Sequence, residues 1–301
     1  MSTPEGYIPV TLDLVAKYRS YFLQTPRKSA DYTFTNLWGW AEYMGMMLSF
    51  REDLCWICQT RPFIRYWAPV GDWNKADWAA QREIREGIAM HRVPAELVSI
   101  LTASLGASGR LQVEDSREQW EYLYSQEELA TLPGNKFHKK KNHVNKFRKT
   151  YGEDYRVLSS DTPDSIEDIL LLQEEWCRWR DCESSPALQA EKDVIFRVVG
   201  NWGRLGTLLG GALYVEDKMV AFSIGEALDE NSLVAHFEKV QPDYSGVYQA
   251  INNAFARYAG RGFDIINREQ DMGEEGLRQA KETYYPIGFL EKSRVVVAAA
   301  K

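Results

Sequence analysis

The chain has 301 residues and a formal net charge of −7 at pH 7. Its length is about twice that of a common single domain, so two domains are expected. Hydrophobic residues make up 45% and charged residues 26%, which is typical of a globular protein and excludes a collagen-like or low-complexity chain.

Neither end of the chain nor its cysteines indicate an export route. No apolar run approaches the length of a membrane span, and the first ten residues lack the basic and apolar regions of a secretion signal. Four cysteines do not form a disulfide framework, so reduced, structural thiols in a cytoplasmic protein are expected. Cys55 and Cys58 have no second pair nearby, and no metal site is expected.

In the first part of the chain, apolar spacing predicts helices and strands in a mixed order. Helices are expected at 11–23, 31–47, 73–89 and 94–105. Strands are expected at 46–50, 54–59, 63–69, 111–115 and 120–124, the first two as a hairpin.

The second part has a similar order of elements. Strands are expected at 155–158, 205–215, 219–228, 233–240, 263–267 and 289–297. Helices are expected at 164–180, 191–201, 247–259 and 274–283. The expected organisation is an N-terminal domain over 1–130, a basic connecting helix over 131–150 and a C-terminal domain over 151–301.

A basic segment separates the two parts. Residues 136–149 carry a charge of +7 and no acidic residue, whereas the rest of the chain carries −14. On a helix, either Phe137, Val144 and Phe147 or Lys140, Val144 and Phe147 share one face, and the basic groups around the remainder could meet phosphates of tRNA, a nucleotide or a lipid headgroup. A solvated helix without a ligand is the alternative. The candidate phosphate-binding residues are Lys136, His138, Lys139, Lys140, Lys141, His143, Lys146, Arg148 and Lys149.

Two segments resemble the acetyltransferase (GNAT) superfamily. Residues 240–250 resemble its cofactor loop, and residues 280–289 resemble its closing helix, turn and Gly-Phe strand entry. The resemblance implies a donor-binding loop at Tyr244, Ser245, Gly246 and Tyr248. Ser245 and Tyr248 depart from the superfamily's pattern, and the bulk of Tyr248 predicts that acetyl-CoA does not bind there in the ordinary way.

A narrower resemblance is carried by residues 31–38, 132–145, 236–239 and 266–273. They resemble the family defined by the C-terminal domain of phosphatidylglycerol lysyltransferase, the DUF2156 group. The resemblance implies an α/β (α+β) fold of two tandem GNAT-like domains, each a mixed, mostly antiparallel sheet flanked by helices. Characterised relatives move an aminoacyl group from charged tRNA to a lipid.

His236 and Glu238 lie two residues apart on a predicted strand, so their side chains are expected on one face, with Glu226 nearby. Acyl transfer needs a general base, which either residue could provide. A hydrogen-bonded pair with a structural role is the alternative.

Polar residues follow the strand predicted at 263–267, where ligands of open α/β sheets bind. Arg268 could hold a carboxylate or phosphate, and Asp271 could pair with an α-amino group. Lys281 would add a stabilising charge, and Tyr285 matches the position of the tyrosine acid of many acetyltransferases. A buried ion-pair network that fixes the loop is the alternative.

The residues and the resemblance together predict transfer of an acyl or aminoacyl group to an amine or hydroxyl. Aminoacyl-tRNA is the leading donor, and the acceptor is a small molecule, a lipid headgroup or a cell-wall precursor. One alternative is a CoA-dependent N-acyltransferase that uses acyl-CoA. The other is a non-catalytic module that binds RNA or a nucleotide through residues 136–149.

Overall fold

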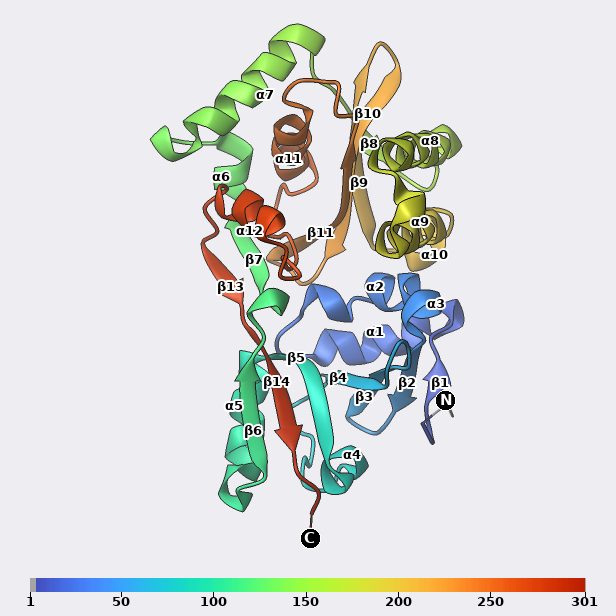
Figure 1. The fold of residues 1–301 in the computed structure, drawn as a ribbon, viewed down its shortest axis with the longest axis vertical. Coiled ribbons are helices and arrows are strands. Elements are labelled where there is room, and N and C mark those ends of the chain that lie inside the picture. Colours follow the sequence, from blue (N-terminus) through green and yellow to red (C-terminus); the bar gives the residue numbers. More distant parts are fainter. Residues whose placement is uncertain (1–3, 301) are drawn as a thin grey trace. The chain divides into compact units, whose positions relative to one another are not determined.

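The computed structural model describes residues 4–300, which form two compact units (Figure 1). The first unit comprises Met1–Glu121, Gln270–Arg278 and Phe289–Lys301, and the second comprises Tyr122–Glu269 and Gln279–Gly288. These units differ from the contiguous ranges 1–130, 131–150 and 151–301. The basic helix lies wholly within the second unit, and the C-terminal strand pairs with strands of the first.

The first unit is built on a seven-stranded sheet with the order β1-β2-β3-β4-β5-β14-β6. Its neighbouring strands are antiparallel except for the parallel pair β4–β5. The strands are β1 (Ile8–Pro9), β2 (Met46–Phe50), β3 (Leu54–Gln59), β4 (Arg65–Gly71), β5 (Ile88–Pro94), β6 (Leu111–Asp115) and β14 (Lys292–Val297). The predicted hairpin of β2 and β3 is confirmed.

The helices of the first unit are α1 (Val15–Gln24), α2 (Phe34–Gly39), α3 (Ala41–Met44), α4 (Arg82–Glu86) and α5 (Ala95–Leu105). The long helix predicted at 73–89 is wrong, since only α4 forms there. Gly87 ends α4 with a φ of +86°, and a β-carbon at that position would come within 2.8 Å of the Ala299 nitrogen. The chain can therefore turn directly into β5, a strand that the sequence did not predict.

The second unit is built on a seven-stranded sheet with the order β13-β7-β12-β11-β10-β9-β8. β8 to β11 form antiparallel pairs, and β12 returns parallel to β11 after the crossover helix α11 (Val247–Tyr258). The strands are β7 (Glu121–Ser125), β8 (Asp154–Leu158), β9 (Leu208–Val215), β10 (Lys218–Ala227), β11 (Ser232–Val240), β12 (Ile265–Asn267) and β13 (Gly288–Leu290).

Helices cover both faces of this sheet. Figure 1 shows α8 and α9 on one side of β10 and α11 and α7 on the other. The faces follow the alternation of β11, since Val240 packs against α11 whereas Lys239 pairs with Glu191 of α9 at 2.8 Å. The other helices are α6 (Gln126–Thr131), α7 (His138–Tyr151), α8 (Pro163–Arg180), α9 (Pro186–Val199), α10 (Trp202–Leu205) and α12 (Glu275–Glu282), which spans a boundary between the units.

A disulfide joins Cys177 and Cys182, so the prediction of four reduced cysteines is wrong at this pair. α8 ends at Arg180, and Asp181 adopts a left-handed conformation that turns the chain back. The two α-carbons thereby come within 5.0 Å. Cys55 and Cys58 are free and buried, in agreement with a structural role.

Among residues 4–300, no helix combines the length and the apolar character that a membrane crossing requires.

Candidate active site

A β-bulge in β11 decides where its polar side chains lie. Phe237 pairs with Ile224 of β10, but the next pair joins Ala235 to Gly225. His236 is therefore an extra residue without a partner position on β10, and the alternation of side chains is interrupted at this point.

The bulge separates the two residues that the sequence places together. Glu238 lies opposite Ser223, whereas His236 bonds to Glu226. Ser223 and Glu226 are three residues apart on a regular part of β10, so they face opposite sides of the sheet. The prediction that His236 and Glu238 share a face is wrong, although the predicted proximity of Glu226 is confirmed.

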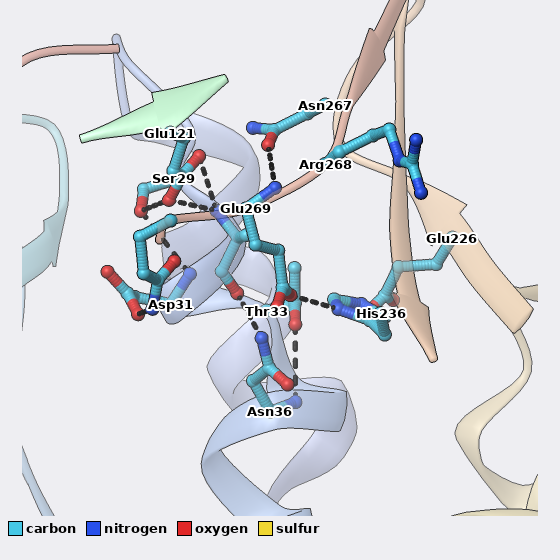
Figure 2. Close-up of polar contacts among 12 residues, drawn as sticks. Ser29, Asp31, Thr33, Asn36, Glu121, Glu226, His236, Asn267, Arg268 and Glu269 are labelled. Atoms are coloured by element: carbon cyan, nitrogen blue, oxygen red, sulfur yellow. Dashed lines mark hydrogen bonds and ion pairs between the residues drawn. The ribbon is translucent and has the colours of Figure 1, made fainter. Parts of the chain in front are cut away.

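His236 lies between two carboxylates (Figure 2). Its Nε2 is 2.9 Å from Glu226 and its Nδ1 is 2.7 Å from Glu269, and the side chain is fully buried. Burial disfavours a charged ring and is the largest single effect, but the hydrogen bonds and charges of the two glutamates together outweigh it and raise the pKa of His236 to about 10. At neutral pH the ring is an imidazolium, which has no free lone pair with which to act as a general base.

This arrangement predicts that the stability of the protein depends on pH. The folded pKa of His236 lies above the ordinary value of 6.5, so its contribution is complete below about pH 6.5 and is lost as the pH rises through about 10. We expect the free energy of unfolding in urea to fall over this window. The same titration of the variant His236→Gln should fall less steeply, and equal slopes would contradict the assignment.

A second polar cluster surrounds Arg268, directly after β12. Its Nη2 donates to Glu238 at 3.1 Å, and the Asn252 amide, with its oxygen turned toward the guanidinium, accepts from Nη1 at 2.7 Å. The guanidinium lies over the ring of Tyr284, with 5.4 Å to the centroid. Burial opposes the charge on Arg268, but Glu238 outweighs it and raises the pKa of the guanidinium. Arg268 and Glu238 thus form a fixed ion pair on the α11 side of the sheet.

Lys140 of α7 approaches the same ring. Its Nζ is 4.1 Å from the centroid of Tyr284, and the side chain is half-buried. Burial first, and repulsion by Arg268 second, lower the pKa of the Lys140 ammonium. Two cations therefore share one aromatic ring, next to the carboxylate of Glu238.

Lys281 is a buried support for this cluster. Its Nζ donates to the carbonyl oxygens of Arg268 at 2.6 Å and Glu269 at 3.1 Å. Glu269 has a φ of +55°, so the chain makes a tight turn there. Lys281 thus fixes the turn that directs the Arg268 and Glu269 side chains to their separate clusters.

Asp271 belongs to the first unit and is not part of either cluster. Its carboxylate is fully buried and accepts from Arg278 at 2.8 Å and from Arg117 at 3.2 Å. It also accepts from the Gly273 amide at 2.9 Å. The two arginines and the backbone amide hold this carboxylate in place, and its binding of an α-amino group stays a prediction.

Tyr285 lies beside the start of α7. Its ring meets Phe137 edge to face at 5.6 Å, the Nζ of Lys136 is 5.7 Å from its centroid, and 46% of the residue is exposed. The neighbouring Tyr284 makes the contact with Arg268 that the sequence assigned to no residue.

The donor-binding loop is packed against α7. Gly246, with a φ of +87°, precedes α11, and a β-carbon there would come within 2.4 Å of the His143 carbonyl oxygen. Tyr244 packs edge to face on Tyr151 of α7 at 5.2 Å, and Tyr248 is partly exposed on α11. Because Gly246 has no side chain, the backbone of helix α7 can pack directly against it.

A glycine substitution tests this packing. Gly246→Ala is expected to lower the free energy of unfolding by about 2 kcal/mol or more, since the left-handed conformation alone costs about 1–2 kcal/mol and the contact with His143 adds to it. Gly206→Ala is the matched control, because Gly206 has the same left-handed conformation, with a φ of +71°, and no atom within 4 Å of the added carbon. Urea unfolding of both variants gives the difference. Equal losses would show that α7 does not pack on Gly246.

Helix α7 has the orientation that the sequence predicts. Phe137, Val144 and Phe147 are buried. Two of the candidate cations are engaged, since Lys136 pairs with Glu128 at 2.7 Å and Arg148 with Glu153 at 2.7 Å. The exposed basic side chains are those of Lys136, His138, Lys139, Lys141, His143, Lys146 and Lys149.

The first unit contains a buried ionic network that the sequence did not reveal, and Figure 2 shows its members Ser29, Asp31 and Glu121. The fully buried Lys292 pairs with Asp31 and, at 2.5 Å, with Glu121. Arg92 also pairs with Asp31, and the Ser29 hydroxyl donates to Glu121 at 2.6 Å. The network joins charges from four distant segments in the core.

One signal could have indicated part of this network. Asp31 and Gln270 both occur in the segments 31–38 and 266–273 that carry the family resemblance, and Gln270 donates to Asp31 at 3.3 Å. Among residues 4–300, no group of three or more His, Cys, Asp or Glu side chains could hold a metal ion.

Residues 23–295 match the family model described as "Phosphatidylglycerol lysyltransferase, C-terminal". The chain belongs to this family. Its two mixed, mostly antiparallel sheets, each flanked by helices, confirm that part of the expected fold class. The family takes its description from the C-terminal part of an aminoacyltransferase, phosphatidylglycerol lysyltransferase.

Other members and neighbours support this placement. The crystal structure of a conserved protein of unknown function from Bacteroides thetaiotaomicron is 31% identical, with a TM-score of 0.87, and the match covers 97% of this chain and 99% of that one. L-PGS from Bacillus licheniformis shares the fold, with a TM-score of 0.66 at 10% identity over 95% of this chain and 92% of that one. An uncharacterised protein of Mycoplasmoides gallisepticum is 28% identical over 177 residues, or 58% of this chain. That match spans 56% of the curated relative's length.

Proposed function

We propose that the second unit transfers an aminoacyl group from charged tRNA to an amine or hydroxyl acceptor. The observation that carries the proposal is the cluster of Glu238, Arg268, Tyr284 and Lys140 beside the end of β12. It combines a carboxylate that can accept a proton with fixed cations that can stabilise a developing negative charge.

Glu238 is the general base in this proposal, because His236 is held as an imidazolium. The carboxylate accepts the proton of the acceptor as its nitrogen or oxygen attacks the ester carbonyl of the donor. The guanidinium of Arg268 stabilises the oxyanion that forms. The ester bond to the 3′ oxygen of the tRNA then breaks, and that oxygen takes up the proton from Glu238.

Ser223 supports a ligand-binding role for this face. It lies opposite Glu238 in the strand register, and its hydroxyl is buried without a hydrogen-bond partner within residues 4–300. Buried polar groups normally have a partner, and functional sites are common exceptions. A substrate group or a water molecule beside Glu238 would satisfy it.

The cluster of Glu226, His236 and Glu269 has a different role. The Glu269 carboxylate bonds to the His236 ring, and 24% of its side chain is exposed. Such a carboxylate suits the ammonium group of an aminoacyl donor. His236 is a positioning residue that fixes Glu269, as Lys281 fixes the backbone of Arg268.

tRNA is favoured over acyl-CoA as the donor. The packing of the Gly246 loop on α7 leaves it poorly suited to the close approach of a pyrophosphate, and the exposed cations of α7 suit a polyanion. The acceptor is the headgroup of a lipid, which the family description suggests, or a small molecule or cell-wall precursor. Charged tRNA is a cytoplasmic donor, so the reaction is placed in the cytoplasm.

Transfer from tRNA charged with labelled amino acids tests the proposal. The purified chain is incubated with the charged tRNA and, in turn, phosphatidylglycerol vesicles, small amines and cell-wall precursors. We expect labelled product with one acceptor class and not with the variant Arg268→Ala. Product with acetyl-CoA as donor instead would favour the CoA-dependent alternative, and tRNA binding without any transfer would favour a non-catalytic module.

A further inference from the structure

The segment after α12 runs along one face of the basic helix. Tyr285 contacts Phe137 and Lys136, and Tyr284 contacts Lys140. Lys136 lies in the 3-10 turn Asn135–Phe137 that precedes α7, and Lys140 lies in the first turn of α7. Each of the two adjacent rings therefore has the ammonium group of one lysine beside it, Lys136 for Tyr285 and Lys140 for Tyr284.

We propose that Tyr285 and Lys140 bind the unpaired 3′ end of an RNA, with Tyr285 stacking on a base and Lys140 holding the neighbouring phosphate. This inference rests on the proposed function for the choice of tRNA as the RNA. It adds a base-stacking role for Tyr285 and assigns Lys140, one of the candidate phosphate-binding residues, to the phosphate next to that base.

Lys140 has the properties of an anion-binding residue. Among the described residues no carboxylate pairs with it, and its contacts are the ring of Tyr284 and the charge of Arg268. The guanidinium is itself neutralised by Glu238, so the ammonium leaves one positive charge at a half-buried position. A phosphate oxygen would supply the missing counter-charge.

Tyr285 has the properties of a stacking platform. It has a φ of +54°, a conformation that glycine or asparagine adopts more readily, at the end of a helix where those residues are common. Its side chain is nonetheless a large, partly exposed ring that Phe137 supports from one edge. Aromatic rings exposed beside lysines bind unpaired bases without sequence preference. A lipid headgroup would satisfy Lys140 but would leave this ring without a partner, so RNA is favoured.

Binding of a fluorescent hexaribonucleotide that ends in CCA, measured by anisotropy over a range of salt concentrations, tests the inference. Lys140→Gln is expected to weaken binding about tenfold and to reduce the salt slope by about 0.7, as loss of one phosphate contact on a single strand requires. Lys140→Arg should retain the affinity. Tyr285→Asn, which relaxes the backbone, should also weaken binding about tenfold but leave the slope unchanged.

Lys218→Gln is the matched control. It removes one exposed positive charge from the second unit, on β10, and should bind the oligonucleotide as the unsubstituted chain does. Unchanged binding by Lys140→Gln, or an equal loss in Lys218→Gln, would overturn the inference. The inference would also be overturned if the chain bound phosphatidylglycerol vesicles but not the oligonucleotide, and if Lys140→Gln abolished the binding of the vesicles.

The binding assay and the transfer assay fail independently. If the chain transfers aminoacyl groups while Lys140→Gln binds the oligonucleotide normally, the RNA site is wrong and the proposed function stands. If oligonucleotide binding depends on Lys140 and Tyr285 but no acceptor is labelled, the RNA site stands and the transferase function is wrong.

Discussion

Replacing Glu238 by glutamine is expected to lower the rate of aminoacyl transfer by a factor of about 10² to 10⁴, the contribution of a general base. Glutamine can still accept the hydrogen bond of Arg268, so the ion-pair site keeps its shape while the proton acceptor is lost. Single-turnover transfer from charged tRNA measures the chemical step separately from binding of the donor.

Two further variants make this result specific. Glu238→Asp retains a carboxylate and should recover part of the rate, whereas Glu230→Gln, at an exposed turn between β10 and β11, should transfer as the unsubstituted chain does. A Glu238→Gln rate within threefold of the original would show that another group accepts the proton. Retained rate in that variant together with a lost rate in His236→Gln would return the base to His236.

Replacing Lys292 by methionine is expected to lower the free energy of unfolding by about 3–5 kcal/mol. The lysine is fully buried between Asp31 and Glu121, so its loss removes from the core a cation that both carboxylates contact, while Arg92 still pairs with Asp31. The unpaired charge, rather than the loss of packing, accounts for the size of the effect, since methionine has a similar volume. Urea unfolding monitored by tryptophan fluorescence gives the value.

The same strand provides the control. Arg294 on β14 pairs with Glu114 at 2.8 Å but is exposed, and Arg294→Met should cost less than about 1 kcal/mol. Adding Glu121→Gln to Lys292→Met removes one of the unbalanced charges and should recover part of the stability. Equal effects of Lys292→Met and Arg294→Met would mean that the buried network contributes little.

The basic helix was predictable from the sequence because its information is local. The apolar residues Phe137, Val144 and Phe147 are spaced for one helix face, and the structure buries all three. The charge pattern alone could not distinguish the cations that pair with nearby acids from the free ones. Lys136 and Arg148 are engaged because Glu128 and Glu153 lie within reach.

The candidate site was predictable only in part. The structure does bring three of the predicted residues together, since Arg268 pairs with Glu238 and Lys281 donates to the carbonyl oxygen of Arg268. The ring beside Arg268 is that of Tyr284, whereas the sequence placed Tyr285 in the candidate site. The left-handed backbone of Tyr285 gives the two adjacent rings different directions, and a Tyr-Tyr pair in the sequence does not indicate this conformation.

The sequence by itself determined the order of most helices and strands, the charged helix and the family, all of which depend on local spacing and motifs. Only the tertiary structure decided which strands pair and where a strand departs from regularity. The bulge at His236 places the side chains of His236 and Glu238 on opposite faces of the sheet, and β14 pairs with β5 of the first unit. Strand pairing is set by hydrogen bonds and burial between segments far apart in the chain, as Lys292 and Asp31 illustrate across 261 positions, so no local pattern records it.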